Sequence, residues 1–442
     1  MKPTTIQEIA CALGKETKSK AIVKGVAVDT RLTRPGDLFF ALPGDRVDGH
    51  TFLEQAAKSG AAGAVVKTGY QEESFGLALI HVDDVLEALQ NLAKNILQRS
   101  HARIVAVTGS LGKTTTKGFI VSLLKNKYRV TASPGNSNSQ IGLPLAIINE
   151  VTLEEDLIVL EMGMTLPGQI SKLIQIAPPH IAVVTTVALV HACSFDSIDD
   201  IARAKSEIFT HPATEIGIYH RDVDHQGVLS QSGVCEKLSF STTSPEADFY
   251  MTSDAIIGPS KIPEHFPPLA IPGAHNKHNF LCAVAVAKCL GMSTEEIIAA
   301  QAQLELPERR LQFIEKCGAL FINDAYNASE LSIKAALNSL PEPKPGGKKI
   351  AVLGGIVELG KFSEACHRAV GEYALDRVDH LFCFGDDCLP IAERWLAVER
   401  PVVWGENRGE VVAALRKELQ PGDVVLLKGS RAKEVWKVLD EL

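Results

Sequence analysis

Residues 104–116 read IVAVTGSLGKTTT, an apolar run that leads directly into a glycine-containing turn. Ile104–Val107 has the β-branched pattern of a strand buried in a parallel sheet. Gly109 and Gly112 permit a tight turn in which backbone N–H groups point at a polyphosphate. The stretch therefore predicts a phosphate-binding loop that joins a parallel strand to a helix.

The residues after the turn strengthen this prediction. Lys113 is placed to neutralise the β- and γ-phosphates, and the Thr114 hydroxyl is placed to bind Mg²⁺. A helix through Leu124 would direct its positive N-terminus at the anion. The full GxxxxGK[ST] pattern has glycine at position 107, where this chain has Val107, so the loop is a shortened form. The alternative is a glycine-rich turn that binds nothing.

Composition limits the class of protein. A chain of 442 residues with 45% hydrophobic and 22% charged residues is typical of a globular protein with two to four domains. The net charge of −8 disfavours general nucleic-acid binding. No apolar run is long enough to span a membrane, and the N-terminus lacks an apolar signal core. Nine cysteines without a CxxC pair indicate reduced thiols in the cytoplasm.

The pattern of strands and helices predicts an α/β protein of three domains. A small α/β domain at 1–98 has strands at 21–28, 38–42 and 64–66, a helix at 52–59 and a connecting helix at 83–99. A central domain at 99–307 has strands at 157–160, 181–186 and 216–219, an antiparallel hairpin within 241–270 and a helix at 276–290. A C-terminal Rossmann-like domain at 308–442 has strands at 319–323, 349–353, 380–384 and 424–427.

Polar residues follow several of these strands. Glu161 comes at the carboxyl end of a strand expected to share the sheet of the phosphate loop, which is a suitable place for a Mg²⁺ ligand. His191 also follows a strand, although a lone histidine at such a position is usually structural.

Lys205 is unusual because it lies on the apolar face of a predicted helix. Ser197 and Asp200 form a capping box at its start, and Ile201 and Ile208 flank the lysine on the buried side. A lysine that faces inward either snorkels to the surface or takes part in chemistry with a perturbed charge. The sequence favours snorkelling.

Three further groups of polar residues come from the hinge region and its flanks. Asn276 and Asn279 share one face at a helix start, where they cap the helix or bind a base and ribose. Arg309 and Arg310 lie in the hinge, from which an arginine could reach a γ-phosphate. Residues 323–328, NDAYNA, end a strand of the last domain, the usual location of an α/β binding site.

Together these segments resemble the Mur ligases, almost from end to end, and within that family the branch that adds D-alanyl-D-alanine. The segments that carry the resemblance are DTR (29–31), FFALPGDRVDGHTF (39–52), TGSLGKTTTK (108–117), GNSNSQIGLPLA (135–146), EMG (161–163), ARAKSEIF (202–209), GAHNKHN (273–279), NDAYNAS (323–329), AVLGGIVELG (351–360) and LLKGSR (426–431).

The resemblance implies a cytoplasmic, monomeric, ATP- and Mg²⁺-dependent ligase that joins D-alanyl-D-alanine to UDP-N-acetylmuramoyl-tripeptide through an acyl phosphate, with no nucleic-acid or membrane partner. It implies catalytic roles for Lys113, His191, Lys205 and Arg310. It implies ATP contacts from Thr108, Gly109, Ser110, Gly112, Lys113, Thr114, Thr115, Asn276, Asn279, Arg310 and Asp324. Metal ligands would be Thr114, Glu161, His191 and Lys205, the last as a carbamate. Thr30, Arg31 and Gly44 would bind the UDP end, and Tyr326, Asn327 and Ala328 the dipeptide.

The chain departs from the family pattern at three places. Arg309 stands where glycine usually precedes the arginine, which leaves two candidate arginines. Gly355 stands where an acidic residue is usual, and Ser329-Glu330 replaces a DNP-like ending. Two other functions remain open: a different amide ligase of the same superfamily, including the folate branch, and a nucleotide-dependent switch or scaffold.

Overall fold

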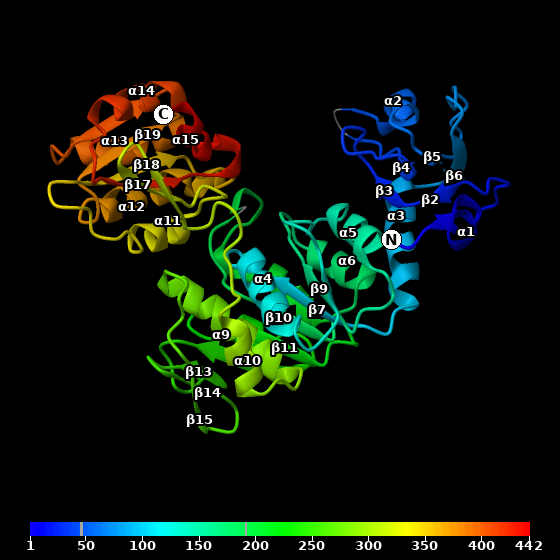
Figure 1. Cartoon of the computed structure of the whole chain (residues 1–442), viewed down its shortest axis with the longest axis horizontal. Coiled ribbons are helices and arrows are strands. Elements are labelled where there is room, and N and C mark those ends of the chain that lie inside the picture. The colour runs from blue at the N-terminus through cyan, green and yellow to red at the C-terminus, as the bar shows by residue number, and fades with distance from the viewer. Residues whose placement is uncertain (45–46, 191) are drawn as a thin grey trace.

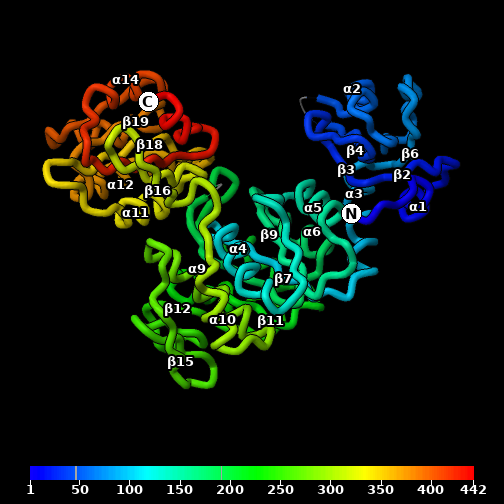
Figure 2. Tube along the Cα trace, in the orientation of Figure 1, coloured from blue at the N-terminus to red at the C-terminus, as the bar shows by residue number. Residues whose placement is uncertain are grey.

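The computed structural model describes residues 1–44, 47–190 and 192–442. Figure 1 shows three α/β lobes in chain order, with the N-terminal and C-terminal lobes at opposite ends of the view and the central lobe between them. The Cα trace in Figure 2 follows the chain through each lobe in turn, and each lobe is built around its own sheet. The predicted three-domain α/β architecture is confirmed, whereas the division at 98/99 and 307/308 stays a prediction.

The N-terminal lobe contains a parallel sheet of order β3-β4-β5-β6 and a small antiparallel pair, β1 with β2. Its elements are β1 (Thr4–Thr5), α1 (Ile6–Ala12), β2 (Ile22–Val23), β3 (Gly25–Ala27), β4 (Asp37–Phe40), a 3₁₀ turn (Gly49–Phe52), α2 (Leu53–Lys58), β5 (Gly63–Lys67), β6 (Ala78–Val82) and α3 (Val85–Gln98).

One prediction for this lobe is wrong. The single strand expected at 21–28 is two strands, because β2 pairs with β1 while β3 pairs with β4 in another sheet, so the chain must break its pairing at Lys24. The helix expected at 52–59 is confirmed as α2, with a 3₁₀ turn before it. The connecting helix α3 is also confirmed, and it packs against α5 of the central lobe.

The central lobe contains a nine-stranded sheet of order β15-β14-β13-β12-β11-β10-β7-β9-β8. Its strands are β7 (Arg103–Thr108), β8 (Val130–Ala132), β9 (Leu157–Glu161), β10 (Ile181–Val184), β11 (Ile216–His220), β12 (Glu236–Ser241), β13 (Phe249–Met251), β14 (Ala255–Ile257) and β15 (Pro263–His265). The seven strands β7 to β13 pair in parallel with one another in the sheet. Strands β13, β14 and β15 pair antiparallel, which confirms a hairpin within 241–270.

Helices cover both faces of this sheet. They are α4 (Lys113–Leu124), α5 (Gly142–Glu150), α6 (Gln169–Ile176), α7 (Ile198–Ser206), α8 (Gln226–Gln231), α9 (Ala274–Cys289) and α10 (Thr294–Gln301). Residues 280–287 of α9 are all buried, as expected of a helix that is apolar on every side, and α9 packs along α4. This packing fixes the phosphate loop against the start of α9.

The C-terminal lobe contains a six-stranded sheet of order β16-β17-β21-β18-β19-β20, parallel except for the edge strand β16. Its elements are β16 (Gln312–Lys316), β17 (Ala319–Asn323), α11 (Glu330–Leu337), β18 (Lys349–Gly354), α12 (Ser363–Ala374), β19 (His380–Phe384), α13 (Leu389–Leu396), β20 (Val402–Gly405), α14 (Arg408–Glu418), β21 (Val424–Lys428) and α15 (Val438–Glu441). The four predicted strands are confirmed as β17, β18, β19 and β21.

Two general features bear on function. Within the three described ranges, no helix combines the length and the apolar character needed to cross a membrane. All nine cysteines are free thiols.

Candidate active site

The phosphate loop has the backbone conformation that its glycines allow. Gly109 has φ +146° and Gly112 has φ +80°, between the end of β7 and the first residue of α4. A Cβ at 112 would lie 2.4 Å from Asn279 Oδ1, and one at 109 would lie 2.0 Å from Thr185 Oγ1. Both positions therefore need glycine for conformation and for close approach.

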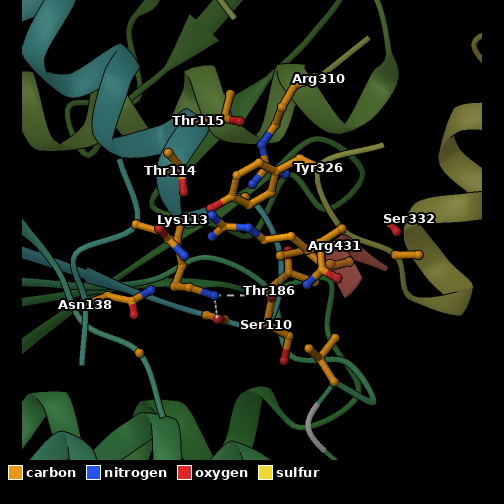
Figure 3. A pocket seen from close by; sticks show the side chains of 18 of the residues that line it. Ser110, Lys113, Thr114, Thr115, Asn138, Thr186, Arg310, Tyr326, Ser332 and Arg431 are labelled. Carbon is orange, nitrogen blue, oxygen red and sulfur yellow. Dashed lines mark hydrogen bonds between the residues drawn. The ribbon is translucent and has the colours of Figure 1, made fainter. Parts of the chain in front are cut away.

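Lys113 lies over this loop. Its Nζ donates a hydrogen bond to the Gly109 carbonyl at 2.7 Å and one to the Ser110 carbonyl at 3.4 Å (Figure 3). Burial lowers the pKa of Lys113, the Glu161 carboxylate raises it, and the Arg310 guanidinium lowers it. A cation held at the mouth of a turn of backbone amides is suited to a polyphosphate.

Glu161 ends β9 and is 1% exposed. Its Oε2 accepts a hydrogen bond from the Thr114 hydroxyl at 2.8 Å, and its Oε1 accepts one from the Asn138 amide at 2.7 Å. Lys117 Nζ lies 3.8 Å from the same carboxylate and donates to the Ser133 and Gly135 carbonyls at 2.6 Å each. A carboxylate and a hydroxyl in contact at the phosphate loop are the hard oxygen donors that Mg²⁺ prefers.

Lys205 faces the interior from α7 and is 3% exposed. Burial first, and then the positive charge of Lys113, hold the pKa of Lys205 well below its usual value. Among the described residues, no carboxylate forms an ion pair with it. The preferred snorkelling interpretation is therefore wrong, because the ammonium end is not carried to the surface. Ser197 caps α7 as predicted, and its hydroxyl donates to the Asp200 carboxylate at 2.7 Å.

Asn276 and Asn279 lie in the first turns of α9 and are both buried. Asn276 donates to the Pro272 carbonyl at 2.7 Å and accepts from Asn279 at 3.1 Å, while Asn279 accepts from the Thr116 hydroxyl at 3.2 Å. The pair thus ties the start of α9 to α4, the helix that carries the phosphate loop.

The last domain supplies the opposite wall. The guanidinium of Arg310 lies 4.5 Å from the centre of the Tyr326 ring, and that of Arg309 lies 4.1 Å from the Trp436 ring. Arg310 Nε is buried without a hydrogen-bond partner among the described residues. Since Arg310 also acts on Lys113, it is the arginine of the two that faces the phosphate loop.

Asp324 is fixed by Lys428, which ends β21 and is 2% exposed. Lys428 Nζ lies 2.5 Å from Asp324 Oδ2 and donates to the Asn327 carbonyl at 3.1 Å. Asp324 Oδ1 accepts from the Leu311 N–H at 3.1 Å. This carboxylate therefore connects the segment after β17 to the hinge.

Both walls line one cavity of about 1240 Å³. The predicted site residues that line it are Gly109, Ser110, Gly112, Lys113, Thr114, Thr115, Glu161, Lys205, Asn276, Asn279, Arg310, Asp324, Tyr326, Asn327 and Ala328. In Figure 3 Arg310 and Tyr326 lie above Lys113 and Ser110, and Arg431 lies beside Lys113. The structure thus brings together residues more than 200 positions apart in the chain.

Other predicted residues lie elsewhere. Thr108 ends β7 and is fully buried, outside the cavity lining. Thr30, Arg31 and Gly44 lie in the N-terminal lobe, where the exposed Arg31 pairs with Asp29 at 2.6 Å. His191 lies outside the described residues.

Three residues at the site were not assigned a role from the sequence: Asn138, Lys117 and Lys428. Each lies in a segment that carries the family resemblance, so the signal was present. Their partners are contributed by other segments, however, and only the folded chain shows that Asn138 and Lys117 hold Glu161 while Lys428 holds Asp324.

Comparison with known proteins agrees with this arrangement. Three family models match the chain: the catalytic domain of the Mur ligase family at residues 22–96, the Mur ligase middle domain at 107–287, and the glutamate ligase domain of Mur ligases at 309–431. The chain is 33% identical to the UDP-N-acetylmuramoyl-tripeptide–D-alanyl-D-alanine ligase of Bacillus subtilis, over 96% of this chain and 94% of that protein.

Solved structures agree as well. A crystal structure of MurF from Acinetobacter baumannii is 28% identical, covers 100% of this chain and 99% of its own, and has a TM-score of 0.88. The MurF ligase of Thermotoga maritima in complex with ADP is 28% identical, covers 95% of this chain and 97% of its own, and has a TM-score of 0.78. By its matched domains, its full-length relatives and its three-lobed architecture, the chain belongs to the Mur ligase family.

Proposed function

We propose that this protein is an ATP-dependent ligase that joins D-alanyl-D-alanine to UDP-N-acetylmuramoyl-tripeptide, giving the pentapeptide precursor of peptidoglycan, ADP and phosphate. One observation carries the proposal. A phosphate loop with its lysine on one wall of a cavity faces Arg310, Asp324 and Tyr326 of another domain on the opposite wall. The full-length relatives named for this reaction support the choice of substrates.

The reaction needs activation, because a free carboxylate is a poor electrophile without a leaving group. In the proposed first step, a carboxylate oxygen of the tripeptide attacks the γ-phosphorus of ATP, the bond to the β–γ bridging oxygen breaks, and ADP leaves. Lys113 and Arg310 stabilise the negative charge spread over the transferred phosphoryl group. The product of this step is an acyl phosphate.

In the second step, the amine of D-alanyl-D-alanine attacks the acyl carbon. The tetrahedral intermediate loses a proton and expels phosphate as the amide bond forms. Tyr326, Asn327 and Ala328 line the cavity where the dipeptide would be held, and the closed site would exclude water from the acyl phosphate. Thr30, Arg31 and Gly44 would bind the UDP end in the N-terminal lobe.

Thr114, Glu161, His191 and Lys205 would hold Mg²⁺, which when bound supplies charge neutralisation for the phosphates. The oxygen donors of Thr114 and Glu161 fit this ion. An ammonium at 205 does not fit it, but a carbamate does. The lowered pKa of Lys205 favours the neutral amine, which attacks CO₂ and releases a proton to give an anionic oxygen ligand. Intact-protein mass that shows only the free amine at Lys205 in CO₂-equilibrated buffer would contradict the carbamate.

We further propose that the enzyme acts as a monomer in the cytoplasm, without nucleic acid or membrane as a partner. There it would serve cell-wall biogenesis, and through it cell shape and division.

The test is ADP release with UDP-N-acetylmuramoyl-tripeptide and D-alanyl-D-alanine, omitting each substrate in turn. We expect release to require both and to yield a pentapeptide product by mass. Release that needs a different amine would assign another ligase reaction of the family. ATP binding by folded protein without release under any of these conditions would favour a nucleotide-dependent switch.

A further inference from the structure

Three potential metal ligands meet at one place in the central lobe, away from Glu161 and Thr114. His220 ends β11, Asp222 follows it by two residues, and His278 comes from the first turns of α9. His220 Nε2 lies 3.4 Å from Asp222 Oδ2, and His278 Nε2 lies 3.9 Å from the same oxygen. One ligand atom from each residue lies within 4.8 Å of the other two.

His220 is the residue that most needs an explanation. It is 7% exposed, and neither of its ring nitrogens has a hydrogen-bond partner within the described ranges. Its ring stacks on Phe240 with centroids 4.9 Å apart and planes 6° apart, which fixes its orientation. Apart from the 3.4 Å contact of Nε2 with the Asp222 carboxylate, both ring nitrogens lack a partner in the described part of the chain. A buried imidazole without hydrogen bonds is costly, so this group calls for a ligand.

The spacing of the donors suits a small ion. Tetrahedral coordination with bonds of about 2.0–2.1 Å places neighbouring ligand atoms roughly 3.3–3.4 Å apart. The His220–Asp222 separation matches this value, and the His278–Asp222 separation requires a shift of a few tenths of an ångström per group.

Neighbouring groups orient the Asp222 carboxylate. The Ser241 hydroxyl donates to Asp222 Oδ1, and the Thr242 N–H donates to Oδ2 at 3.2 Å. Outer contacts of this kind are typical of metal-binding carboxylates. The Thr242 hydroxyl lies 2.6 Å from His278 Nε2 and must turn aside for that nitrogen to bind an ion.

We propose that His220, Asp222 and His278 form a binding site for one divalent transition-metal ion of the Zn²⁺ class. Two imidazoles and one carboxylate select such ions over Mg²⁺, which prefers oxygen. His220 and His278 line the same cavity as Asn276 and Asn279, so the site borders the cleft. The site is separate from the oxygen-rich one at Glu161 and does not depend on the proposed ligase reaction.

Co²⁺ is a suitable probe because its visible absorption reports coordination geometry. The metal-free full-length protein is titrated with Co²⁺ in excess Mg²⁺, which occupies the oxygen-rich site. We expect one equivalent to bind with an intense tetrahedral d–d spectrum and without a thiolate-to-cobalt charge-transfer band, and one equivalent of Zn²⁺ to displace it.

Asp222→Asn and His278→Gln keep the size and polarity of the side chains they replace. Each should weaken Co²⁺ binding at least about 100-fold, since even groups that only orient a ligand contribute about 10–100-fold. His265→Gln is the matched control, because His265 lies 3.6 Å from Asp254 in an exposed pair that belongs to no group of three potential ligands within the described ranges. It should bind Co²⁺ as the wild type does.

Three outcomes would overturn the proposal: wild-type protein that binds no stoichiometric Co²⁺, a thiolate charge-transfer band, or equal binding by both site variants. Circular dichroism establishes that each variant is folded. If Asp222→Asn fails to fold, His278→Gln alone decides, since the His278 side chain is 27% exposed and its neighbours Asn276 and Asn279 stay unchanged.

Discussion

Lys113, Lys205 and Lys428 are three lysines that meet in the cavity, and burial is the first cause of a lowered pKa in each. Lys428 has a direct carboxylate partner in Asp324, whereas Lys113 donates to backbone carbonyls. Lys113 and Arg310 therefore supply positive charge to the cleft of a chain whose net charge is −8. A local cluster of cations, rather than the overall field, would attract a polyphosphate.

Replacing Lys113 with alanine removes the cation nearest the phosphate loop. Turnover in the ADP-release assay should fall by roughly 10²–10³ or more, by analogy with the loss of one preorganised donor. Lys125→Ala is the control, since this exposed lysine lies just past the other end of α4. Near-wild-type turnover in Lys113→Ala would contradict the assignment of the loop.

His275 predicts a pH dependence of stability. Burial is the main cause that lowers its pKa to about 4. Asp324 raises the pKa, whereas Lys428, His278 and Arg310 lower it further. Below pH 6.5 the unfolded chain binds a proton that the folded protein does not, so stability falls as pH drops from 6.5 towards 4. The full effect of this one group is about 3 kcal/mol.

His275→Gln should therefore lose less stability than the wild type between pH 7 and pH 4.5. Above pH 7 the free energy of unfolding of the two proteins should change with pH in nearly the same way. Urea unfolding of the central lobe at several pH values measures this. The exposed His265→Gln serves as control and should follow the wild type. An unchanged acid slope in His275→Gln would contradict the buried neutral histidine.

At the scale of elements, the junction of β7 and α4 depends on Gly112. Alanine at 112 must adopt φ +80° and place its Cβ 2.4 Å from Asn279 Oδ1. This oxygen accepts the hydrogen bond from Thr116 that joins α4 to α9. We expect Gly112→Ala to cost about 1–2 kcal/mol of stability from its backbone alone and to raise the KM for ATP at least about tenfold.

Gly118→Ala provides the matched control within the same helix. Gly118 lies inside α4, and a Cβ there would meet nothing within 4 Å. This substitution should stabilise the protein by about 1 kcal/mol through helix propensity and leave the KM for ATP unchanged. Equal kinetics in both variants would show that the loop tolerates a side chain at 112.

The sequence predicted buried parallel strands well and edge strands poorly. The observed bounds of β17 and β19 equal the predicted ones, because fully buried strands read as continuous apolar runs. Edge strands β16 and β20 were missed, since the exposed, charged sequence QFIEK of β16 has no buried face to produce a pattern. The break at Lys24 was also missed, because only pairing with two different sheets creates it.

For the site, local pattern found the phosphate loop, Glu161 and the buried position of Lys205. Local pattern could not predict features of the site that depend on contacts between segments far apart in the chain. Snorkelling of Lys205 was preferred because a helix pattern shows which face is buried but not how far the burial extends. The positions of Arg310 and Asp324 opposite the loop follow from the approach of the last lobe, which no local pattern contains.

At the scale of the molecule, the described residues of the central and C-terminal lobes include two contact regions. One is the hinge that carries Arg309 and Arg310. The other joins the 3₁₀ turn Ala192–Ser194 to the turn Gly360–Phe362, where the Cys193 N–H donates to the Glu358 carbonyl at 3.0 Å. The ion pair between Lys361 and Asp196 at the same contact is exposed and contributes little. The hydrogen bond and this exposed ion pair join a turn of the central lobe to a turn of the C-terminal lobe outside the hinge.

This second contact offers a direct test of whether the last lobe must move. A Cβ at residue 360 would lie 3.2 Å from Cys193 Cβ, within a few tenths of an ångström of the roughly 3.5–4.5 Å that disulfides span. Gly360→Cys should therefore form a disulfide with Cys193 under oxidising conditions, seen as a loss of two free thiols. Since lobe motion would gate substrate entry and product release, ligase turnover of the cross-linked enzyme should fall at least about tenfold and return on reduction.

The double variant Cys193→Ser/Gly360→Cys separates the cross-link from the substitution itself, because it carries the same side chain at 360 without a partner. Full turnover in the oxidised single variant would mean that the reaction proceeds with this contact intact, and the closure of the site would then have to come from the N-terminal lobe.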